Sequence, residues 1–279
     1  MFGSYGVWSK LIGASIGPLF QAWVRALLLV IVLIPILLWK KEIIPIEKKD
    51  WKWMGLFLIF TSFTNAPIFY AFTHMDIGTA SLLFFVSQVL TMYVVGIFFL
   101  GEKLTKIKII SFFLALLGMY IVYSFSLIAF TFLAAGMAVL NGIASGGEVS
   151  FSKKLSGNYS PLYLVWLTWV TTVVTNAPVS YLLGETWSAD IITNTGIYLV
   201  GFALAGVIGF TAIIEGLKTV EASIAGVLGL VEIVFAIGFG ILLFSEELSM
   251  KVIIGGALIM VAAALPHVVE MGWKKKNLV

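Results

Sequence analysis

The chain has 279 residues, of which 61% are hydrophobic and 11% charged, with a net charge of +3 and a mean hydropathy of +1.08. A soluble domain carries about 25% charged residues, so a water-soluble fold is excluded. The apolar runs are continuous, which excludes the alternating pattern of a β-barrel. There is no cysteine, and the two histidines lie far apart in sequence. We therefore expect no disulfide, no metal site and no cofactor, and the small net charge does not indicate a nucleic-acid partner.

Ten apolar segments are long enough, or nearly so, to cross about 30 Å of hydrocarbon. The predicted fold class is an all-α membrane protein with about ten transmembrane helices. The first segment is short, which predicts either support from neighbouring helices or a natural chain that begins upstream. The predicted spans are 2–15, 18–39, 53–73, 78–100, 107–125, 128–151, 161–183, 195–216, 222–244 and 252–271.

Basic residues predict the orientation, because cytoplasmic loops are enriched in Lys and Arg. If the N-terminus is cytoplasmic, most of the 17 basic residues fall on the cytoplasmic side. We therefore expect a multi-pass protein of the inner or plasma membrane with both termini in the cytoplasm. The lysines on that side are Lys40, Lys41, Lys48, Lys49, Lys52, Lys103, Lys106, Lys108, Lys153, Lys154, Lys218, Lys274, Lys275 and Lys276.

An internal repeat divides the chain. Pro18-Leu with a tryptophan five residues on recurs at Pro161, an offset of 143 residues, and other pairs share nearly the same offset. A constant offset over separate matches argues against chance similarity between apolar segments. The sequence therefore predicts two similar halves, residues 1–126 and 127–279, with five spans each.

Five spans is an odd number, so the second half is predicted to be inverted in the membrane. The segment Leu-Gly-Glu-Lys-Leu-Thr at 100–105 recurs as Phe-Ser-Glu-Glu-Leu-Ser at 244–249. Lys103 is thereby replaced by Glu247, as an exchange of sides requires. Inverted repeats are typical of secondary transporters, which place a solute site near the membrane midplane between the halves.

Short motifs that occur twice, in order, resemble a known family. The first copy reads Tyr70-Ala71-Phe72, Gly78–Leu83, Leu100–Thr105 and Gly118, and the second reads Gly216–Ser223, Ser245–Ser249 and Gly255–Ala257. Over nearly the whole chain these motifs resemble the EamA branch of the drug/metabolite transporter superfamily. The resemblance implies a transporter and not an enzyme, with the first, third, fourth, sixth, eighth and ninth helices lining a central cavity.

One departure from the family concerns proline. Family members often have a proline midway along the fourth and ninth helices, where this chain has Ser87-Gln88-Val89 and Val231-Glu232-Ile233. Kinks at those two places are therefore expected to be weaker, or to be supplied by glycine.

Four polar side chains fall near the middle of predicted spans that belong to the cavity-lining set: Asn65, Gln88, Asn141 and Glu232. Polar groups at this depth are costly and usually face a cavity or a partner. They are candidates for binding the solute. The alternative is that they join helices, where such hydrogen bonds contribute about 0.6–2 kcal/mol.

Further candidates lie on the same helices. Glu148 shares a helical face with Asn141, and Trp8 and Lys10 lie in the first span, where Lys10 suits a carboxylate or phosphate. Glu232 is the main candidate for proton coupling, unless it only caps its helix. Glu215, near the cytoplasmic end of the eighth span, is the second.

The predicted function is a secondary transporter of small organic metabolites, exporting amino acids or related compounds by alternating access with proton coupling. Export and the solute class are implied by the family resemblance. A carrier of sugar-phosphate, nucleotide-sugar or lipid-linked substrates ranks lower, because it would need several basic residues in the cavity. A membrane enzyme would need clustered acids, histidines or metal ligands, and the sequence has no such cluster. The expected partners are the solute, the lipid bilayer and protons, with the chain acting as a monomer or weak homodimer.

Overall fold

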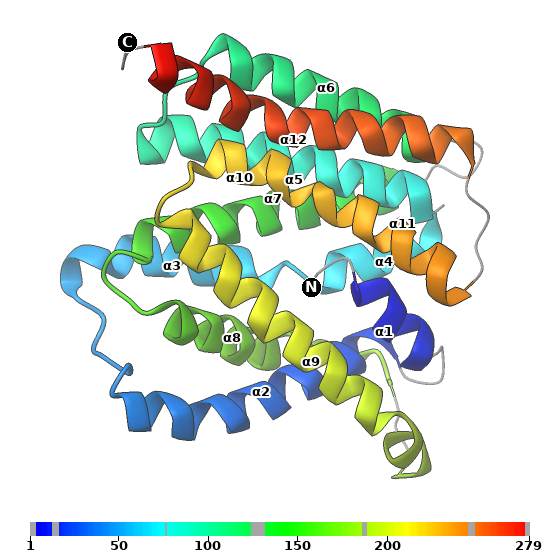
Figure 1. Ribbon diagram of the computed structural model, residues 1–279. Helices are drawn as coiled ribbons and strands as arrows, with labels where there is room; N and C mark the ends of the chain where they lie inside the picture. The colour runs from blue at the N-terminus through cyan, green and yellow to red at the C-terminus, as the bar shows by residue number, and fades with distance from the viewer. Residues whose placement is uncertain are drawn as a thin grey trace.

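The computed structural model describes residues 4–12, 17–75, 77–123, 132–185, 189–244 and 249–276, and within these ranges the chain is helical without strands (Figure 1). The boundary predicted between residues 126 and 127 lies outside them. The helices are α1 (Tyr5–Ile12), α2 (Pro18–Lys40), the 3-10 helix η2 (Lys48–Asp50), α3 (Trp51–Ser62), α4 (Ala66–His74), α5 (Ile77–Leu100), α6 (Lys106–Tyr123), α7 (Phe132–Leu155), α8 (Pro161–Leu182), α9 (Ala189–Leu217), α10 (Ala222–Gly229), α11 (Val231–Phe244) and α12 (Met250–Lys276).

The described residues contain seven helical stretches that are long and apolar enough to cross a membrane. They coincide with the second, third, fourth, sixth, seventh, eighth and ninth predicted spans. The fifth predicted span corresponds to α6, which begins with two lysines, and the tenth to α12, whose apolar part is Met250–Pro266. The seven stretches are Leu19–Lys40, Lys48–Phe72, Thr79–Leu100, Phe132–Leu155, Pro161–Leu182, Thr195–Leu217 and Ala222–Leu243.

Two predicted spans are not continuous helices. The third breaks between α3 and α4, just before Pro67, whose ring nitrogen has no hydrogen to donate back along the helix. The ninth breaks at Leu230, directly after Gly229, so the interruption follows a glycine and not a proline. The fourth, α5, runs unbroken past Gln88, and α8 runs unbroken past Pro178.

The α2 and α8 helices are packed against each other and are tied at both ends. Shortly after its last residue, each helix is followed by a residue with positive φ, Lys41 (55°) after α2 and Gly184 (70°) after α8. The acid that follows then reaches the N-terminus of the other helix. Glu42 accepts a 2.6 Å hydrogen bond from the Ser160 hydroxyl, and Glu185 accepts from the first backbone N–H groups of α2 at 3.2 and 2.5 Å. Carboxylates at helix N-termini satisfy orphan N–H groups and the helix dipole.

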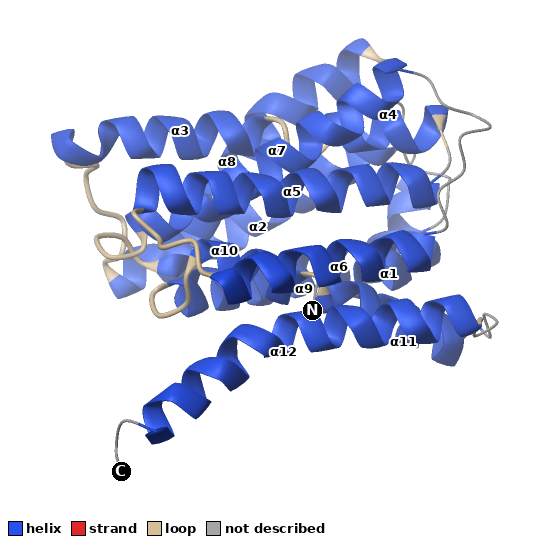
Figure 2. Ribbon diagram, turned by 90° about the horizontal axis from the view of Figure 1, so that it is seen from above, coloured by secondary structure: helices blue, strands red, loops and turns tan. Residues whose placement is uncertain are grey.

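The α6 and α12 helices cross where Gly118 meets Gly255, along the outer edge of the bundle (Figures 1 and 2). A Cβ atom on Gly118 would lie 2.7 Å from the Gly255 carbonyl oxygen, and one on Gly255 would lie 2.6 Å from that of Gly118. Further along, the Ser111 hydroxyl donates to the Ala262 carbonyl at 2.5 Å. Small residues therefore allow the two backbones to touch, as is common between helices in lipid.

The α7 helix lies at the centre of the fold, against α3, α4 and α5. More than half of its residues are buried, including its two glycines that face α5, Gly142 and Gly146. The α1 helix packs mainly on α9, where the Trp8 ring covers Gly201. Of the polar residues predicted from the sequence, two lie on α7 and two at the helix breaks, namely Asn141, Glu148, Asn65 and Glu232.

We predict that Gly118→Ala destabilises the protein by about 1–3 kcal/mol, because the added methyl must push α6 away from the Gly255 carbonyl. The matched control is Gly136→Ala in α7, where an added Cβ meets nothing within 4 Å and a better helix former should be neutral or stabilising. Thermal unfolding of both purified variants in detergent measures the difference. Equal melting temperatures would show that α6 and α12 do not cross at these glycines.

Candidate functional site

The break between α3 and α4 is closed by a side chain from α7. Pro67 leaves the carbonyl of Phe63, four residues earlier, without its helical donor. The Asn141 Nδ2 group donates to that carbonyl oxygen at 3.0 Å, and Asn141 is only 1% exposed. In this conformation one donor of the Asn141 amide is therefore engaged in holding the broken helix against α7.

Two turns towards the lysine-rich end of α7, Glu148 is buried between three helices. Its Oε1 atom accepts from the Thr61 hydroxyl of α3 at 3.0 Å and from the Thr168 hydroxyl of α8 at 3.1 Å. No basic side chain forms a salt bridge with it in the part of the chain that the structure describes. Neutral donors satisfy this acid, so it joins α3, α7 and α8 at membrane depth.

Gln88 of α5 is also bonded within the protein. Its Nε2 group donates to the Ser145 hydroxyl of α7 at 2.8 Å. The backbones approach closely here, since a Cβ on Gly146 would lie 2.5 Å from the Gln88 carbonyl oxygen. Gln88 keeps part of its surface exposed, so it borders open space as well as joining α5 to α7.

Glu232 has a different environment. It is the second residue of α11, directly after the break at Leu230, and it is partly exposed. None of the hydrogen bonds or salt bridges found among the described residues involves its carboxylate. Asn65 occupies the comparable place at the other break, as the N-cap of α4, where its amide donates to the adjacent Thr64 hydroxyl at 3.2 Å. Both interrupted helices thus present a polar side chain at the start of their second segment.

Three further predicted residues lie on α1 and α9. The Trp8 indole of α1 donates to the hydroxyl of Ser4, just before that helix, at 3.1 Å, and the Lys10 side chain lies outside the described part of the chain. Glu215 is exposed at the end of α9 and forms a 2.7 Å ion pair with Lys218. It is therefore at the edge of the bundle and not in the buried polar group.

Sequence reasoning missed a group of contacts at the lysine-rich end. Glu102, which follows α5, accepts from the backbone N–H groups of Ala222 and Ser223 at 2.5 and 3.0 Å and from the Ser223 hydroxyl at 2.7 Å. Lys108 forms an ion pair with Glu221 beside it. Glu102, Ala222 and Ser223 belong to the motifs that resemble the family, but their spacing in sequence gives no sign that the segment after α5 caps α10.

Arg25 is a second residue whose surroundings the sequence did not reveal. It is 5% exposed, and its guanidinium lies 3.9 Å from the centre of the Phe202 ring and 5.5 Å from that of Trp169. These cation–π contacts stabilise a buried charge between α2, α8 and α9.

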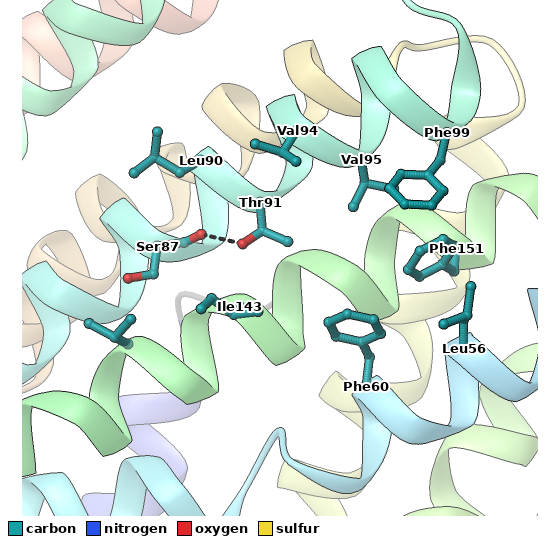
Figure 3. Close-up of a pocket in the computed structure, with 11 residues that line it drawn as sticks. Leu56, Phe60, Ser87, Leu90, Thr91, Val94, Val95, Phe99, Ile143 and Phe151 are labelled. Carbon is teal, nitrogen blue, oxygen red and sulfur yellow. Dashed lines mark hydrogen bonds between the residues drawn. The ribbon is translucent and has the colours of Figure 1, made fainter. Parts of the chain in front are cut away.

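An apolar cavity lies elsewhere. A cavity of about 500 Å³ between α3, α5 and α7 is lined almost wholly by apolar side chains, with Ser87 and Thr91 as its polar members (Figure 3). None of the predicted site residues lines it. A second cavity of about 490 Å³ is lined by Lys153, Lys154 and Lys218.

A helical, multi-pass membrane protein with interrupted helices and polar groups at membrane depth has the architecture of a small-solute carrier. The chain belongs to the EamA-like transporter family, whose model matches residues 1–124 and 132–266. It is therefore a membrane transporter of the drug/metabolite transporter type, in a family whose members are transporters rather than enzymes.

The fold resembles a solved structure. A crystal structure described only as that of a protein has a TM-score of 0.76 and 17% sequence identity, over 95% of this chain and 93% of the other. At that identity the likeness shows the fold alone. No match was found among curated protein sequences.

We predict that Asn141→Leu destabilises the protein by about 1–2 kcal/mol, because the Phe63 carbonyl loses its donor in an apolar setting. Adding Pro67→Ala restores a backbone N–H that closes the helix on the same carbonyl. The double variant should therefore recover most of the lost melting temperature, measured by thermal unfolding in detergent. If Pro67→Ala adds its effect independently of Asn141→Leu, the two residues do not share the Phe63 carbonyl.

Proposed function

We propose that the chain is a secondary transporter that exports amino acids or related compounds across the plasma membrane by alternating access, coupled to protons. The observation that carries the proposal is the Glu232 carboxylate, partly exposed at a helix break without a hydrogen-bond partner among the described residues. By contrast, three other acids accept hydrogen bonds from donors within the protein: Glu102, Glu148 and Glu185.

The contacts between helices support an arrangement of ten spans in two inverted halves. At the 143-residue offset of the repeat, α2 corresponds to α8 and Glu42 corresponds to Glu185. Each of these acids reaches the N-terminus of the partner helix, so one contact is the image of the other. The crossing of α6 and α12 shows the same symmetry at an offset of 144. Gly118 then corresponds to Ala262, and Ser111 corresponds to Gly255. Gly118 contacts Gly255, and Ser111 contacts Ala262, so the two contacts are images of each other. The two stretches matched by the family lie on either side of the proposed boundary at residues 126 and 127.

The distribution of lysines supports the proposed topology. Lys40, Lys103, Lys154 and Lys218 all belong to loops or helix ends that the topology places on one side of the membrane. The positive-inside rule makes that side the cytoplasm, with both termini there.

In the proposed export step, the Glu232 carboxylate binds the ammonium group of the solute and a proton alternately. When it is ionised, Glu232 attracts the ammonium group of an amino acid. When it is protonated from the outer side, it releases that group. Solute outward and proton inward then exchange at one site. Glu215 is the second proposed proton acceptor, in the solvent-accessible position next to Lys218.

The remaining predicted residues complete the proposed solute site. Asn65 and Gln88 are partly exposed and retain hydrogen-bonding capacity for the solute's polar groups. Asn141 and Glu148 are proposed to position the broken third span beside them. Trp8 and Lys10 are proposed to close the site from α1. The functional unit is proposed to be a single chain, since the small-residue faces found are occupied by intramolecular contacts.

The lysine-rich end is proposed to be the closed side in this conformation. Glu102 of the first half caps α10 of the second half, and the Lys153 ammonium donates to the carbonyls of Leu217 and Val220. Of these contacts, that of Glu102 with α10 joins the halves, and we propose that it separates when the site opens to the cytoplasm.

Purified protein in liposomes tests the solute class. We expect saturable flux and counterflow of amino acids, driven by an inward proton gradient, and no flux of glucose 6-phosphate as the control for the sugar-phosphate alternative. If a mixture of all the common amino acids gives no counterflow and no thermal stabilisation, amino acids are not the substrates. Flux of the sugar phosphate alone would favour the alternative carrier.

The variant Glu232→Gln tests the coupling. It should abolish transport driven by the pH gradient while leaving solute exchange, with half-saturation raised about tenfold or more by the loss of a charged partner. Glu215→Gln is the matched control, since the same substitution is made in the other candidate acid. Unchanged uphill transport in Glu232→Gln together with its loss in Glu215→Gln would transfer the coupling role to Glu215.

A further inference from the structure

The apolar cavity between α3, α5 and α7 opens towards the lipid. Several of its lining side chains are more than a third exposed, including Leu90, Val94 and Ile143, and Figure 3 shows them on α5 and α7. Exposed aliphatic groups on a membrane helix face hydrocarbon. None of the proposed solute residues lines this cavity, so we treat it as a lateral groove separate from them.

The groove follows the helix axes. Its lining begins at Ser87 and reaches Phe99 on α5, and it runs from Val139 to Phe151 on α7. Twelve residues of helix rise about 18 Å. A groove of that length covers more than half of one membrane's hydrocarbon thickness of about 30 Å.

The groove ends beside the second cavity, which is basic. Phe99 lines the groove and the adjacent Leu100 lines the basic cavity, while on α7 Phe151 lines the groove and Lys153 and Lys154 line the basic cavity. The two openings are therefore neighbours at the ends of the same two helices.

Three lysines line the basic cavity. Lys153 donates to backbone carbonyls, and Lys218 is paired with Glu215. Lys154 is exposed and lies 5.4 Å from the Trp53 ring, a residue type typical of the membrane interface. An apolar groove beneath a cluster of lysines matches a molecule with an acyl chain and an anionic head.

We infer that this surface binds one anionic phospholipid of the lysine-rich leaflet, with an acyl chain in the groove and its phosphate against Lys154 and Lys153. The lysines supply the attraction for the headgroup, and basic pockets between membrane helices are known to favour acidic lipids. The groove is long and apolar, so it suits the acyl chain of a lipid, which a free phosphate lacks. The site is separate from the proposed solute residues and does not depend on the transport function.

The test is native mass spectrometry of the purified protein in detergent, titrated with dioleoylphosphatidylglycerol or dioleoylphosphatidylcholine. We expect the anionic lipid to bind at least about fivefold more tightly. Lys154→Gln should lose about fivefold of the affinity for the anionic lipid alone. Val94→Trp should fill the groove and weaken both lipids.

The matched controls are Lys40→Gln, an exposed lysine proposed for the same side of the membrane, and Ile110→Trp, an exposed aliphatic residue on α6 away from the groove. All four positions are exposed, and unchanged melting temperatures verify the fold. Equal affinity for the two lipids, or equal losses in test and control variants, overturns the inference. Displacement of the anionic lipid by sodium phosphate at millimolar concentration also overturns it, because the site would then be a phosphate site without an acyl component.

Discussion

Hydrocarbon offers no water to hydrogen-bond with the backbone, so every N–H and C=O group at membrane depth must find a partner within the protein. Continuous helices meet this requirement by themselves, and the structure depends on how it is met where helices stop. At the break before Pro67, Asn141 of α7 supplies the missing donor to Phe63. At the starts of α2 and α10, Glu185 and Glu102 arrive from segments more than 100 residues away and accept the orphan N–H groups. The interruptions of helices are therefore also the places where distant parts of the chain are joined.

The same requirement separates structural acids from the acid proposed to function. An ionisable group within the membrane is expensive, and a partner reduces its cost. Glu148 has two threonine hydroxyls, and Glu102 has a helix N-terminus. Glu232 lies at a break without such a partner among the described residues. Under the proposed mechanism, a solute or a proton binds its carboxylate in turn and so reduces the cost of placing the acid in the membrane.

Helices in lipid gain little from apolar contact with one another, because lipid tails are as apolar as leucine. The bundle is accordingly held by close backbone approaches, as at Gly118 and Gly255, and by a small number of polar ties at helix ends. Such an arrangement suits a carrier, since a few end contacts, such as that of Glu102 with α10, can separate without exposing a large core. It also leaves grooves on the lipid face, and the one beside Lys154 combines an apolar length with a basic end.

The sequence by itself determined the class of fold, because continuous apolar runs, lysine-rich loops and paired motifs depend only on composition and spacing. It also placed polar residues at membrane depth, Asn65, Gln88, Asn141 and Glu232 among them. It did not distinguish their roles, since an amide at Asn141 completes a broken helix, whereas the amide at Asn65 is partly exposed beside Thr64. Only the tertiary structure decided that Glu42 and Glu185 reach the N-termini of each other's helices and that Glu102 reaches Ser223. The physical reason is that these contacts join residues across 100 positions or more, where local periodicity carries no information about which helix ends meet.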